Sequence, residues 1–228
     1  MNYTLVFEEV KSLIKRDLEA IVVLRDQRMS KEDKSFVTQG DLLVNDKVKS
    51  VFDGHFKDYL FITEEATDHS DDDYDGFIVV VDPIDGTENF TSGFPEWGIS
   101  ISCFKGGVHQ ASMLACPELD IWLKSGDKIK KHFSRIRGLS SSMSIEEIMQ
   151  ATQGYEYRIL GCCVYNMVNV IRGSFLSFEN PKGANSWDIL AGLNLALEHN
   201  LNVTVDGRSY HGEYLHPTKK YKFKMENE

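Results

Sequence analysis

The amino-acid sequence predicts an α+β fold in which helices and sheets are stacked in layers. Two observations predict this class. Segments with helical spacing of apolar residues open the chain and recur near its end, whereas its middle carries apolar runs with the composition of β-strands. Helical and strand segments do not alternate regularly, as they would in a repeated βαβ arrangement, and this favours mixed layers.

The first third of the chain predicts two helices followed by a strand. Apolar residues recur at helical spacing from Leu5 to Val23, and a polar stretch over residues 29–35 ends this helix. A second helix is expected to start at Asp41, because Asp is favoured at N-caps. Residues 59–63 are apolar and rich in strand formers, so they predict a short strand.

The middle of the chain predicts a sheet. The acidic residues 67–76 indicate a solvated loop, and the β-branched run over residues 77–81 predicts a strand that is buried on both faces and ends at Asp82. An antiparallel meander is expected to follow, with strands over residues 97–104, 108–115 and 119–123.

The last third predicts short mixed elements. Ser144 opens an S-x-x-E pattern, which is typical of a capping box at a helix start. Beyond it we expect strands over residues 157–160, 174–178 and 203–205, and helices over residues 166–171 and 188–198. The tail after Gly207 shows no clear period. No linker is evident, so we expect one domain over residues 1–228, with an N-terminal half (1–135) and a C-terminal half (136–228).

Composition and charge exclude several classes of protein. The net charge of −10 argues against a general nucleic-acid binder, which needs a basic face. No apolar run approaches the roughly 18 residues that span a bilayer. Because the N-terminus alternates charged and apolar residues, we do not expect it to be a signal peptide. The four cysteines lack a C-x-x-C pair, so reduced thiols in a cytoplasmic protein are expected. The histidines show no zinc-binding spacing.

The run from Asp82 to Thr87, D-P-I-D-G-T, carries the strongest chemical signal. A buried strand delivers Asp82 to its end, Pro83 stops strand pairing because it lacks an N–H, and Gly86 permits a sharp turn. Asp82 and Asp85 then lie on either side of the turn, where their repulsion favours a shared divalent cation, Mg²⁺ or Mn²⁺. A helix starting after Gly86 would direct free N–H groups to the same point, where they suit a phosphate. The spacing is also compatible with a turn that binds nothing.

Four segments, in order along the chain, resemble motifs of the inositol monophosphatase family. Residues 82–90, D-P-I-D-G-T-E-N-F, are similar to its first signature. Residues 187–192, W-D-I-L-A-G, are similar to its second, with Leu190 in place of a small residue. Residues 61–65 resemble its strand ending in G-E-E, with Thr in place of Gly, and residues 37–41 resemble its V-T-x-x-D segment.

This resemblance implies the family's layered α-β-α-β-α sandwich, the fold of fructose-1,6-bisphosphatases, with a shortened C-terminal part. The chain looks like a short bacterial-type member. It is shorter in the meander after Leu123 and again after Val205, and the C-terminal strands that are then missing usually help cover the second sheet. The family's enzymes are lithium-sensitive phosphomonoesterases that use Mg²⁺. We therefore expect two or three Mg²⁺ per site, with Mn²⁺ as a substitute, and a cytoplasmic homodimer.

The resemblance also implies a role for each site residue. The metal ligands would be the carboxylates of Glu64, Asp82, Asp85 and Asp188 and the main-chain carbonyl of Ile84. Asp82 would bridge two ions. Glu64 and Thr87 would orient and activate the attacking water, and Asp41 would support Thr87. The substrate-binding residues would be Gly86, Thr87, Asp85 and Asp188, with the N–H groups of Gly86 and Thr87 holding phosphate oxygens.

The predicted reaction is hydrolysis of a small inositol, sugar or polyol phosphate by a metal-activated water, without a covalent intermediate. Other family activities stay open, namely those on 3'(2'),5'-bisphosphate nucleotides, fructose 1,6-bisphosphate and histidinol phosphate. A binding module without catalysis is a further alternative, since a fold does not fix a function. The intact acidic set argues against that alternative.

Three weaker signals remain. Residues 71–76 match the first half of a calcium loop, but the β-rich sequence that follows argues against an EF-hand. Residues 161–163, Gly-Cys-Cys, fall where the family approaches its substrate, although buried packing is the simplest role for the thiols. Glu179 and Asn185 lie in a loop where family members contact substrate hydroxyls.

Overall fold

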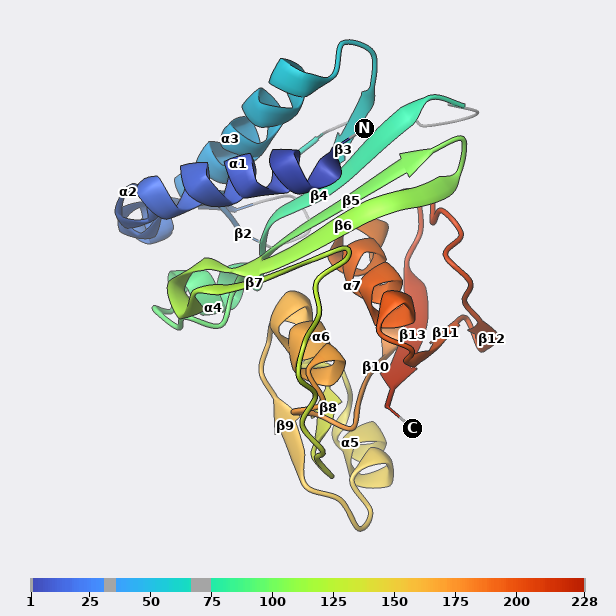
Figure 1. Cartoon of the computed structure of the whole chain (residues 1–228). Helices are drawn as coiled ribbons and strands as arrows, with labels where there is room; N and C mark the ends of the chain where they lie inside the picture. Colours follow the sequence, from blue (N-terminus) through green and yellow to red (C-terminus); the bar gives the residue numbers. More distant parts are fainter. Residues whose placement is uncertain (1, 31–35, 67–74, 228) are drawn as a thin grey trace.

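The computed structural model describes residues 2–30, 36–66 and 75–227. Figure 1 shows two sheets with a pair of helices between them and a second pair of helices on the outer face of the first sheet. Most of the acidic segment 67–76, including residues 71–74 of the calcium-loop pattern, lies outside the described residues. In the described part of the chain, no helix is both long and apolar enough to cross a bilayer.

The N-terminal helices form the outer layer. The expected first helix is broken at Asp17 into α1 (Tyr3–Arg16) and α2 (Leu18–Val23), and a 3-10 helix η1 (Leu24–Asp26) follows. Helix α1 packs against α3 through an apolar stripe, because its residues Val6, Val10 and Ile14 are buried at helical spacing.

The next elements correct two predictions. Strands β1 (Arg28–Ser30) and β2 (Phe36–Thr38) pair antiparallel where the sequence indicated a polar break. Helix α3 (Gln39–His55) starts before Asp41, and its N-cap is Thr38. Asp41 is instead the third residue of the helix and closes a capping box, in which its carboxylate accepts a hydrogen bond from the Thr38 N–H.

The first sheet has five strands in the order β3-β4-β5-β6-β7. Strand β3 (Leu60–Thr63) is parallel to β4 (Phe77–Asp85), and β5 (Gly98–Lys105), β6 (Val108–Cys116) and β7 (Ile121–Lys124) continue as the predicted antiparallel meander. Strand β4 runs on through the D-P-I-D motif and does not end at Asp82, although the pairing register with β5 shifts between Asp82 and Asp85.

Alternating residues of β4 face two separate cores. Val79 and Val81 pack with the residues of α1 and α3, whereas Ile78 and Val80 pack with those of α6 (Cys163–Ile171) and α7 (Ser186–Glu198). The predicted burial of this strand on both faces is therefore confirmed.

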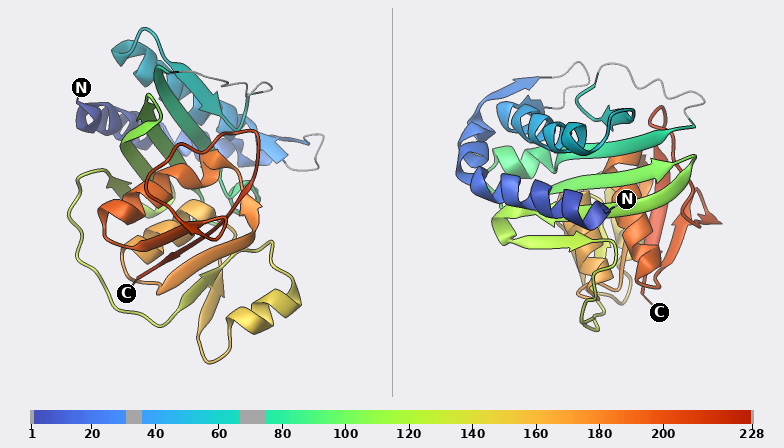
Figure 2. Two further views of the ribbon diagram at one scale, coloured as in Figure 1. Left: turned by 90° about the vertical axis from the view of Figure 1, so that its right-hand side faces the viewer. Right: turned by 45° about the horizontal axis from the view of Figure 1, so that its top comes forward.

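Helices α6 and α7 lie between the first sheet and a second sheet of six strands (Figure 2). The order of the second sheet is β12-β11-β13-β10-β8-β9. Its strands are β8 (Arg137–Leu139), β9 (Tyr157–Ile159), β10 (Ser177–Ala184), β11 (Asn202–Val205), β12 (Arg208–Ser209) and β13 (Tyr221–Glu226). The short helix α5 (Ile145–Ala151) is joined to this sheet by an ion pair between Glu147 and Lys182, 2.9 Å long.

The C-terminal half corrects further predictions. Strand β8 was not predicted, and β10 begins three residues later than the expected strand. Helix α6 begins at Cys163 and α7 at Ser186, both ahead of their expected starts. The tail, in which the sequence showed no clear period, contains β13, and this strand lies in the interior of the second sheet. The capping box at Ser144 is confirmed.

Candidate metal centre and substrate cavity

Three carboxylates from distant parts of the chain meet at one end of the first sheet. Strand β3 is parallel to β4 with Thr63 opposite Val81, so Glu64 follows β3 beside Asp82. Asp188 arrives from the first turn of α7. One oxygen of each carboxylate lies within 4.8 Å of the others. This is the spacing of ligands that share a metal ion, and it brings together three of the residues predicted from the sequence.

Asp82 is buried with an unsatisfied oxygen. Its Oδ1 atom accepts a hydrogen bond from the Ile84 N–H at 3.1 Å. Its Oδ2 atom is buried and has no hydrogen-bond partner among the residues that the structure describes. A buried, unpartnered carboxylate oxygen is costly, and a bound cation removes that cost.

Asp188 is held by the start of its helix. The Asn185 N–H donates to Asp188 Oδ2 at 2.8 Å. The helix start is anchored in turn to β5, because the Ser100 hydroxyl donates to the Trp187 carbonyl at 2.8 Å. The second signature segment is thus fixed against the first sheet, and Asp188 reaches the centre from α7.

Asp85 lies on the same cavity wall but is engaged by α6. Its Oδ2 atom accepts hydrogen bonds from the Cys162 thiol at 2.9 Å and from the Val164 N–H. Burial raises the pKa of Asp85 to about 6, and these hydrogen bonds act in the opposite direction. Burial beside Asp85 also raises the pKa of the Cys162 thiol, which therefore stays protonated and able to donate.

Electrostatics make this cluster unfavourable without a cation. Burial raises the pKa of Asp82 well above its ordinary value, and the charges of Glu64, Asp85 and Asp188 raise it further. Burial, followed by the charges of Glu64 and Asp85, also raises the pKa of Asp188. Buried carboxylates that repel one another and offer hard oxygen atoms fit a divalent cation such as Mg²⁺.

The turn after Asp85 requires glycine. Gly86 has a φ of +82°, in the left-handed region, and a Cβ atom there would lie 2.9 Å from Cys162 Cβ. Helix α4 (Thr87–Thr91) begins directly after it, as predicted. The Thr87 hydroxyl donates to the Ile84 carbonyl at 3.2 Å. The proposed ligand Ile84 and the proposed catalytic Thr87 are therefore neighbours in this structure, while their roles stay predictions.

The remaining motif residues have structural contacts. Asn89 Nδ2 donates to the carbonyls of Glu96 and Leu160, at 2.7 Å each, which fastens α4 to the segment before α6. Phe90 is fully buried and packs edge-on against Trp97 at 5.1 Å. The end of the first signature therefore holds the turn in place.

Asp41 is buried near this centre, yet its carboxylate is used locally. Its Oδ2 atom accepts hydrogen bonds from the N–H of Thr38 at 2.7 Å and from the Thr38 hydroxyl at 2.5 Å. Burial raises the pKa of Asp41 to about 6; the hydrogen bonds from Thr38 act against this shift, and the charge of Glu64 adds to it. No hydrogen bond joins Asp41 to Thr87 among the described residues, so the predicted support of Thr87 stays a prediction.

The carboxylates open into a cavity of about 340 Å³. Gly161, Cys162 and Cys163 line it, in agreement with the position that the sequence indicated for them. Asn185 lines it as well, whereas Glu179 is not among the described lining residues. Sequence reasoning missed further lining residues, namely Ser140, Ser141, Ser142, Asn166, Phe178, Asn180, Gly183, Ala184 and Lys220.

A comparison with known protein families accounts for this geometry. The model of the inositol monophosphatase family matches residues 1–133, which is more than half of the chain. The chain belongs to the inositol monophosphatase family. The matched region contains Glu64, Asp82, Asp85 and the turn at Gly86, whereas Asp188 lies beyond it.

Curated relatives carry names from the same family. A protein of Thermotoga maritima named fructose-1,6-bisphosphatase/inositol-1-monophosphatase is 30% identical over 143 residues, which are 55% of this chain and 55% of the relative. A protein of Aquifex aeolicus with the same name is 27% identical over 215 residues, 82% of this chain and 79% of the relative. The match to the Thermotoga protein thus spans about half of that protein's length.

Solved structures share the fold. A staphylococcal inositol monophosphatase-1 soaked in LiCl has a TM-score of 0.82 and 20% identity, over 95% of this chain and 86% of that one. An IMPase/NADP phosphatase complexed with Mg²⁺ and phosphate has a TM-score of 0.80 and 20% identity, over 95% and 87%. The predicted layered fold is confirmed.

Proposed function

We propose that this protein is a Mg²⁺-dependent phosphomonoesterase that hydrolyses a small phosphorylated sugar or polyol. The observation that supports it most is the buried, unpartnered Oδ2 atom of Asp82 beside the oxygens of Glu64 and Asp188, at one end of a polar cavity. The names of the relatives agree with this substrate class, and one structural neighbour was crystallised with Mg²⁺ and phosphate.

The proposed metal ligands are Glu64, Asp82, Asp85, Asp188 and the carbonyl of Ile84. They would hold two or three Mg²⁺, with Mn²⁺ as a substitute. When bound, the metal neutralises phosphate charge, makes water more acidic and stabilises the departing alcohol oxygen. The thiol of Cys162 and the N–H of Asn185 fix two of the carboxylates before any ligand arrives, and such preorganisation favours catalysis.

The other site residues act on the phosphate and on water. The N–H groups of Gly86 and Thr87 lie at the start of α4 and would hold phosphate oxygens. Glu64 would accept the proton of the attacking water, and the Thr87 hydroxyl would fix the position of that water. Asp41 would support Thr87 from a position close enough to Glu64 for the Glu64 charge to raise the pKa of Asp41. We also propose a cytoplasmic homodimer with no nucleic-acid or membrane partner.

A screen for phosphate release tests this function. The purified protein should release phosphate from inositol, sugar or histidinol monophosphates, or from nucleotide bisphosphates, in Mg²⁺ or Mn²⁺, and should lose this activity in EDTA. Asp82→Asn controls for a contaminating phosphatase, because it should be inactive when prepared identically. A folded protein that binds Mg²⁺ yet releases no phosphate from any of these esters would indicate a binding module instead.

A further inference from the structure

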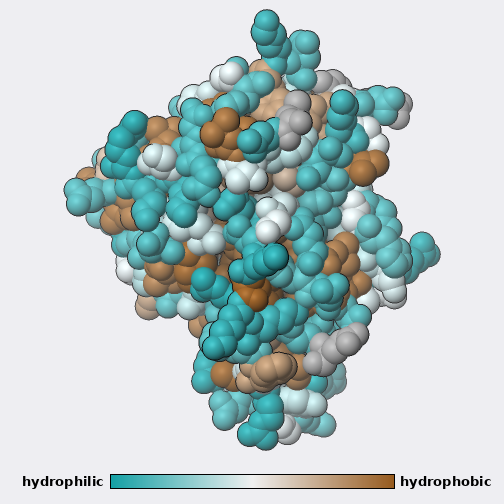
Figure 3. All heavy atoms as spheres, in the orientation of Figure 1, coloured by the Kyte–Doolittle hydropathy of each residue, from teal (hydrophilic) through white to brown (hydrophobic). Residues whose placement is uncertain are grey.

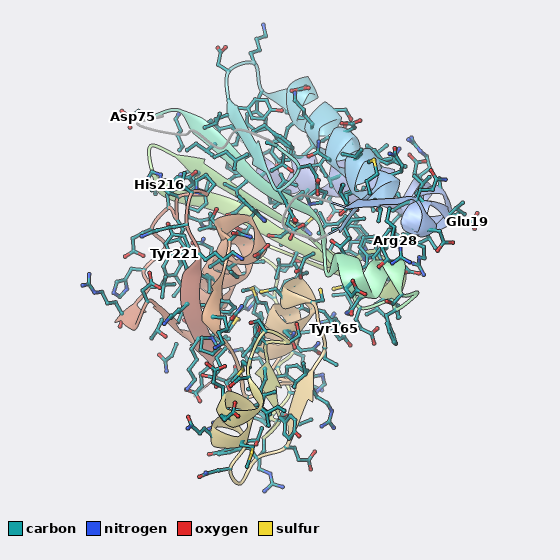
Figure 4. All side chains as sticks on the ribbon, turned by 180° about the vertical axis from the view of Figure 1, so that it is seen from behind. Glu19, Arg28, Asp75, Tyr165, His216 and Tyr221 are labelled. Carbon is teal, nitrogen blue, oxygen red and sulfur yellow. The ribbon has the colours of Figure 1, made fainter. Side chains whose placement is uncertain are left out.

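The second sheet ends in a strand edge that no other strand of the described chain covers. Strand β9 is the last strand of this sheet and, within the described residues, pairs only with β8. Figure 4 shows it from behind, below the helix α6 that carries the labelled Tyr165, at the end of the molecule away from the first sheet. All three β9 residues are exposed. A free edge presents unpaired N–H and C=O groups and can therefore pair with a further strand.

Pairing with β8 determines which backbone groups of β9 face the free edge. The N–H of Arg137 in β8 donates to the Glu156 carbonyl at 2.8 Å, so the backbone groups of Glu156 and Arg158 point toward β8. Alternate residues of a strand direct their N–H and C=O groups to opposite edges, and those of Tyr157 and Ile159 therefore point away from β8. The Arg158 guanidinium lies along this free edge, because its Nη1 atom donates to the Tyr157 carbonyl at 2.8 Å.

Apolar side chains gather around the same edge. Eleven large apolar side chains are exposed in the part of the chain that the structure describes, and five of them fall between residues 145 and 159, namely Ile145, Met149, Tyr155, Tyr157 and Ile159. Arg137 joins the end of α5 to this region. Its Nη1 atom donates to the Ala151 carbonyl at 3.3 Å, and its guanidinium carbon lies 3.7 Å from the centre of the Tyr155 ring. Exposed apolar groups that cluster in this way mark an interaction surface.

The sequence of this edge is complementary to itself. Residues 155–159 read Y-E-Y-R-I. When two copies of the strand run antiparallel with Tyr157 opposite Tyr157, each Glu156 lies opposite Arg158 of the partner subunit, and each Tyr155 lies opposite Ile159 of the partner subunit. The two Tyr157 residues can then exchange their free N–H and C=O groups. An axis at Arg158 or at Glu156 would instead place like charges opposite each other, which is unfavourable.

We propose that β9 pairs antiparallel with β9 of a second copy of this chain, about a two-fold axis at Tyr157, and so joins the two second sheets into one. This inference goes beyond the phosphatase function and gives the proposed homodimer its interface. Charges on an edge strand commonly prevent pairing, but here opposite charges meet at the axis. Three residues bury too little area for a stable dimer, so the exposed tyrosines and the apolar side chains of α5 complete the contact.

Charge reversal tests this pairing by sedimentation of the full-length protein. Wild type should be a dimer. Arg158→Glu and Glu156→Arg should each raise the dimer Kd by about 10-fold or more, because two attractive pairs become repulsive. An equimolar mixture of the two variants should form heterodimers, since every carboxylate again meets a guanidinium. The double variant Glu156→Arg/Arg158→Glu should dimerise with a Kd within about 3-fold of the wild-type value, because the swapped charges still complement each other.

Arg208→Glu is the matched control. It makes the same change of charge at an exposed position of β12, the strand at the opposite edge of the same sheet, and should stay dimeric. Thermal melts establish that each variant is folded. A monomeric wild type, a dimer that Arg158→Glu does not weaken, or a mixture that forms no heterodimer would overturn the proposal. Because assembly is measured without substrate, these results leave the phosphatase function standing, whereas a dimer that releases no phosphate would count against that function alone.

Discussion

Asp82 is the residue at which folding and function conflict most. Asp82 is 1% exposed, one of its carboxylate oxygens is unsatisfied among the described residues, and burial together with four acidic neighbours raises its pKa. A residue chosen for stability alone would be apolar or hydrogen-bonded at this place. The cost of this arrangement is removed when a cation binds, so metal binding and stability should be linked at Asp82.

We predict that Asp82→Asn abolishes the stabilisation by Mg²⁺ together with the activity. Wild-type protein should gain about 2.7 kcal/mol of unfolding free energy when Mg²⁺ is present at about 100 times its Kd. The metal-free variant should be at least as stable as the metal-free wild type, because one of several repelling charges is gone. Denaturant titrations with EDTA or Mg²⁺ measure both effects. Asp58→Asn, at an exposed position, is the control; a variant that still gains stability from Mg²⁺ would rule out Asp82 as a ligand.

A second residue-scale prediction concerns Thr87. Thr87→Ala should lower kcat by about 10²–10⁴ with a smaller change in substrate affinity, the loss expected for one positioned proton-transfer group. Thr87→Ser should keep much of the activity, because its hydroxyl can still donate to the Ile84 carbonyl. Steady-state kinetics and thermal melts on both variants measure this. A lowered melting temperature with near-normal kcat in the alanine variant would leave Thr87 a purely structural role at the turn.

Asp41 allows a prediction about pH. Its folded pKa is about 6 against an ordinary value of 3.8, so the folded state binds the proton more tightly than the unfolded state. The contribution of this pKa shift to the free energy of unfolding is fully present below about pH 4 and is lost as the pH rises through about 6. As the pH rises across this window, the free energy of unfolding of the wild type should therefore fall by on the order of 3 kcal/mol relative to that of Asp41→Asn.

Denaturant titrations in EDTA at several pH values test this difference. Comparing the two proteins cancels the titration of other groups, including exposed carboxylates with lowered pKa such as Glu8 and Asp53. In Asp41→Asn the hydrogen bonds from Thr38 should survive, because the amide oxygen of Asn also accepts them. A difference that does not change with pH would show that Asp41 titrates normally in the folded protein.

The acidic site residues were predictable from sequence because their chemistry is local to short motifs. Asp82, Asp85 and Gly86 fall within six positions of one another, and the D-P-I-D-G-T run alone suggests a cation. Lys220 carried no such signal. Its place on the cavity wall depends on pairing between Ala184 and Tyr221 and on the absent side chain of Gly183, which are tertiary properties.

At the scale of elements, predictions succeeded where one local pattern dominates. The meander from β5 to β7 and the capping box of α5 follow from apolar runs, turns and an S-x-x-E pattern. Strand β13 was missed although its burial alternates perfectly from Tyr221 to Glu226. Its sequence, Y-K-F-K-M-E, alternates apolar and charged residues with the two-residue period of a half-buried strand, so the signal was present but was overlooked behind the irregular segment before it. The start of α3 was misjudged because Thr38, also a good N-cap, competes with Asp41.

Close packing of β5 against α6 gives the prediction at this scale. A Cβ atom at Gly98 would lie 2.4 Å from Cγ1 of Val164, a stiff side chain that is fully buried. Gly98→Ala should therefore lower the free energy of unfolding by about 2 kcal/mol or more, as overpacking does. Gly54→Ala is the matched control, because Gly54 lies in α3 with open space around it, and alanine there should stabilise by up to about 1 kcal/mol.

Denaturant unfolding of both variants decides the matter. Gly98→Ala should lower the free energy of unfolding, whereas Gly54→Ala should raise it. If Gly98→Ala is neutral, then α6 can shift relative to the sheet, and the hydrogen bond from the Val164 N–H to Asp85 would not be held rigidly. In that case the Mg²⁺ affinity of the variant should fall, which a binding titration would detect.

On the scale of the whole molecule, the N- and C-terminal halves share one of their two cores. The first core joins α1 and α3 to the first sheet, whereas the second joins that sheet to α6, α7 and the second sheet. The surface seen in Figure 3 is largely hydrophilic, with apolar residues scattered in small groups. Removing the C-terminal half would uncover a continuous apolar sheet face that is now buried.

We predict that the fragment 1–135 does not fold as a stable monomer. It retains the first core, but it exposes the face that includes Ile78, Val80, Phe104 and Leu114, each at most 2% exposed in the whole chain. It also keeps Glu64, Asp82 and Asp85 without Asp188, so the metal centre would be incomplete. Exposed apolar patches of this kind bind hydrophobic dyes and promote association. Dye fluorescence and size-exclusion chromatography measure the outcome.

Co-expression with the fragment 136–228 provides the control, since it returns α6, α7 and Asp188 to the sheet. A soluble complex of one copy of each fragment, stabilised by Mg²⁺, is expected, because the two pieces regain the shared core and the complete carboxylate set. A fragment 1–135 that is monomeric, melts cooperatively and ignores its partner would instead show that the halves are independent domains. The metal centre would then lie between two separately folded units, and Asp188→Asn should leave the melt of the N-terminal unit unchanged both with and without Mg²⁺.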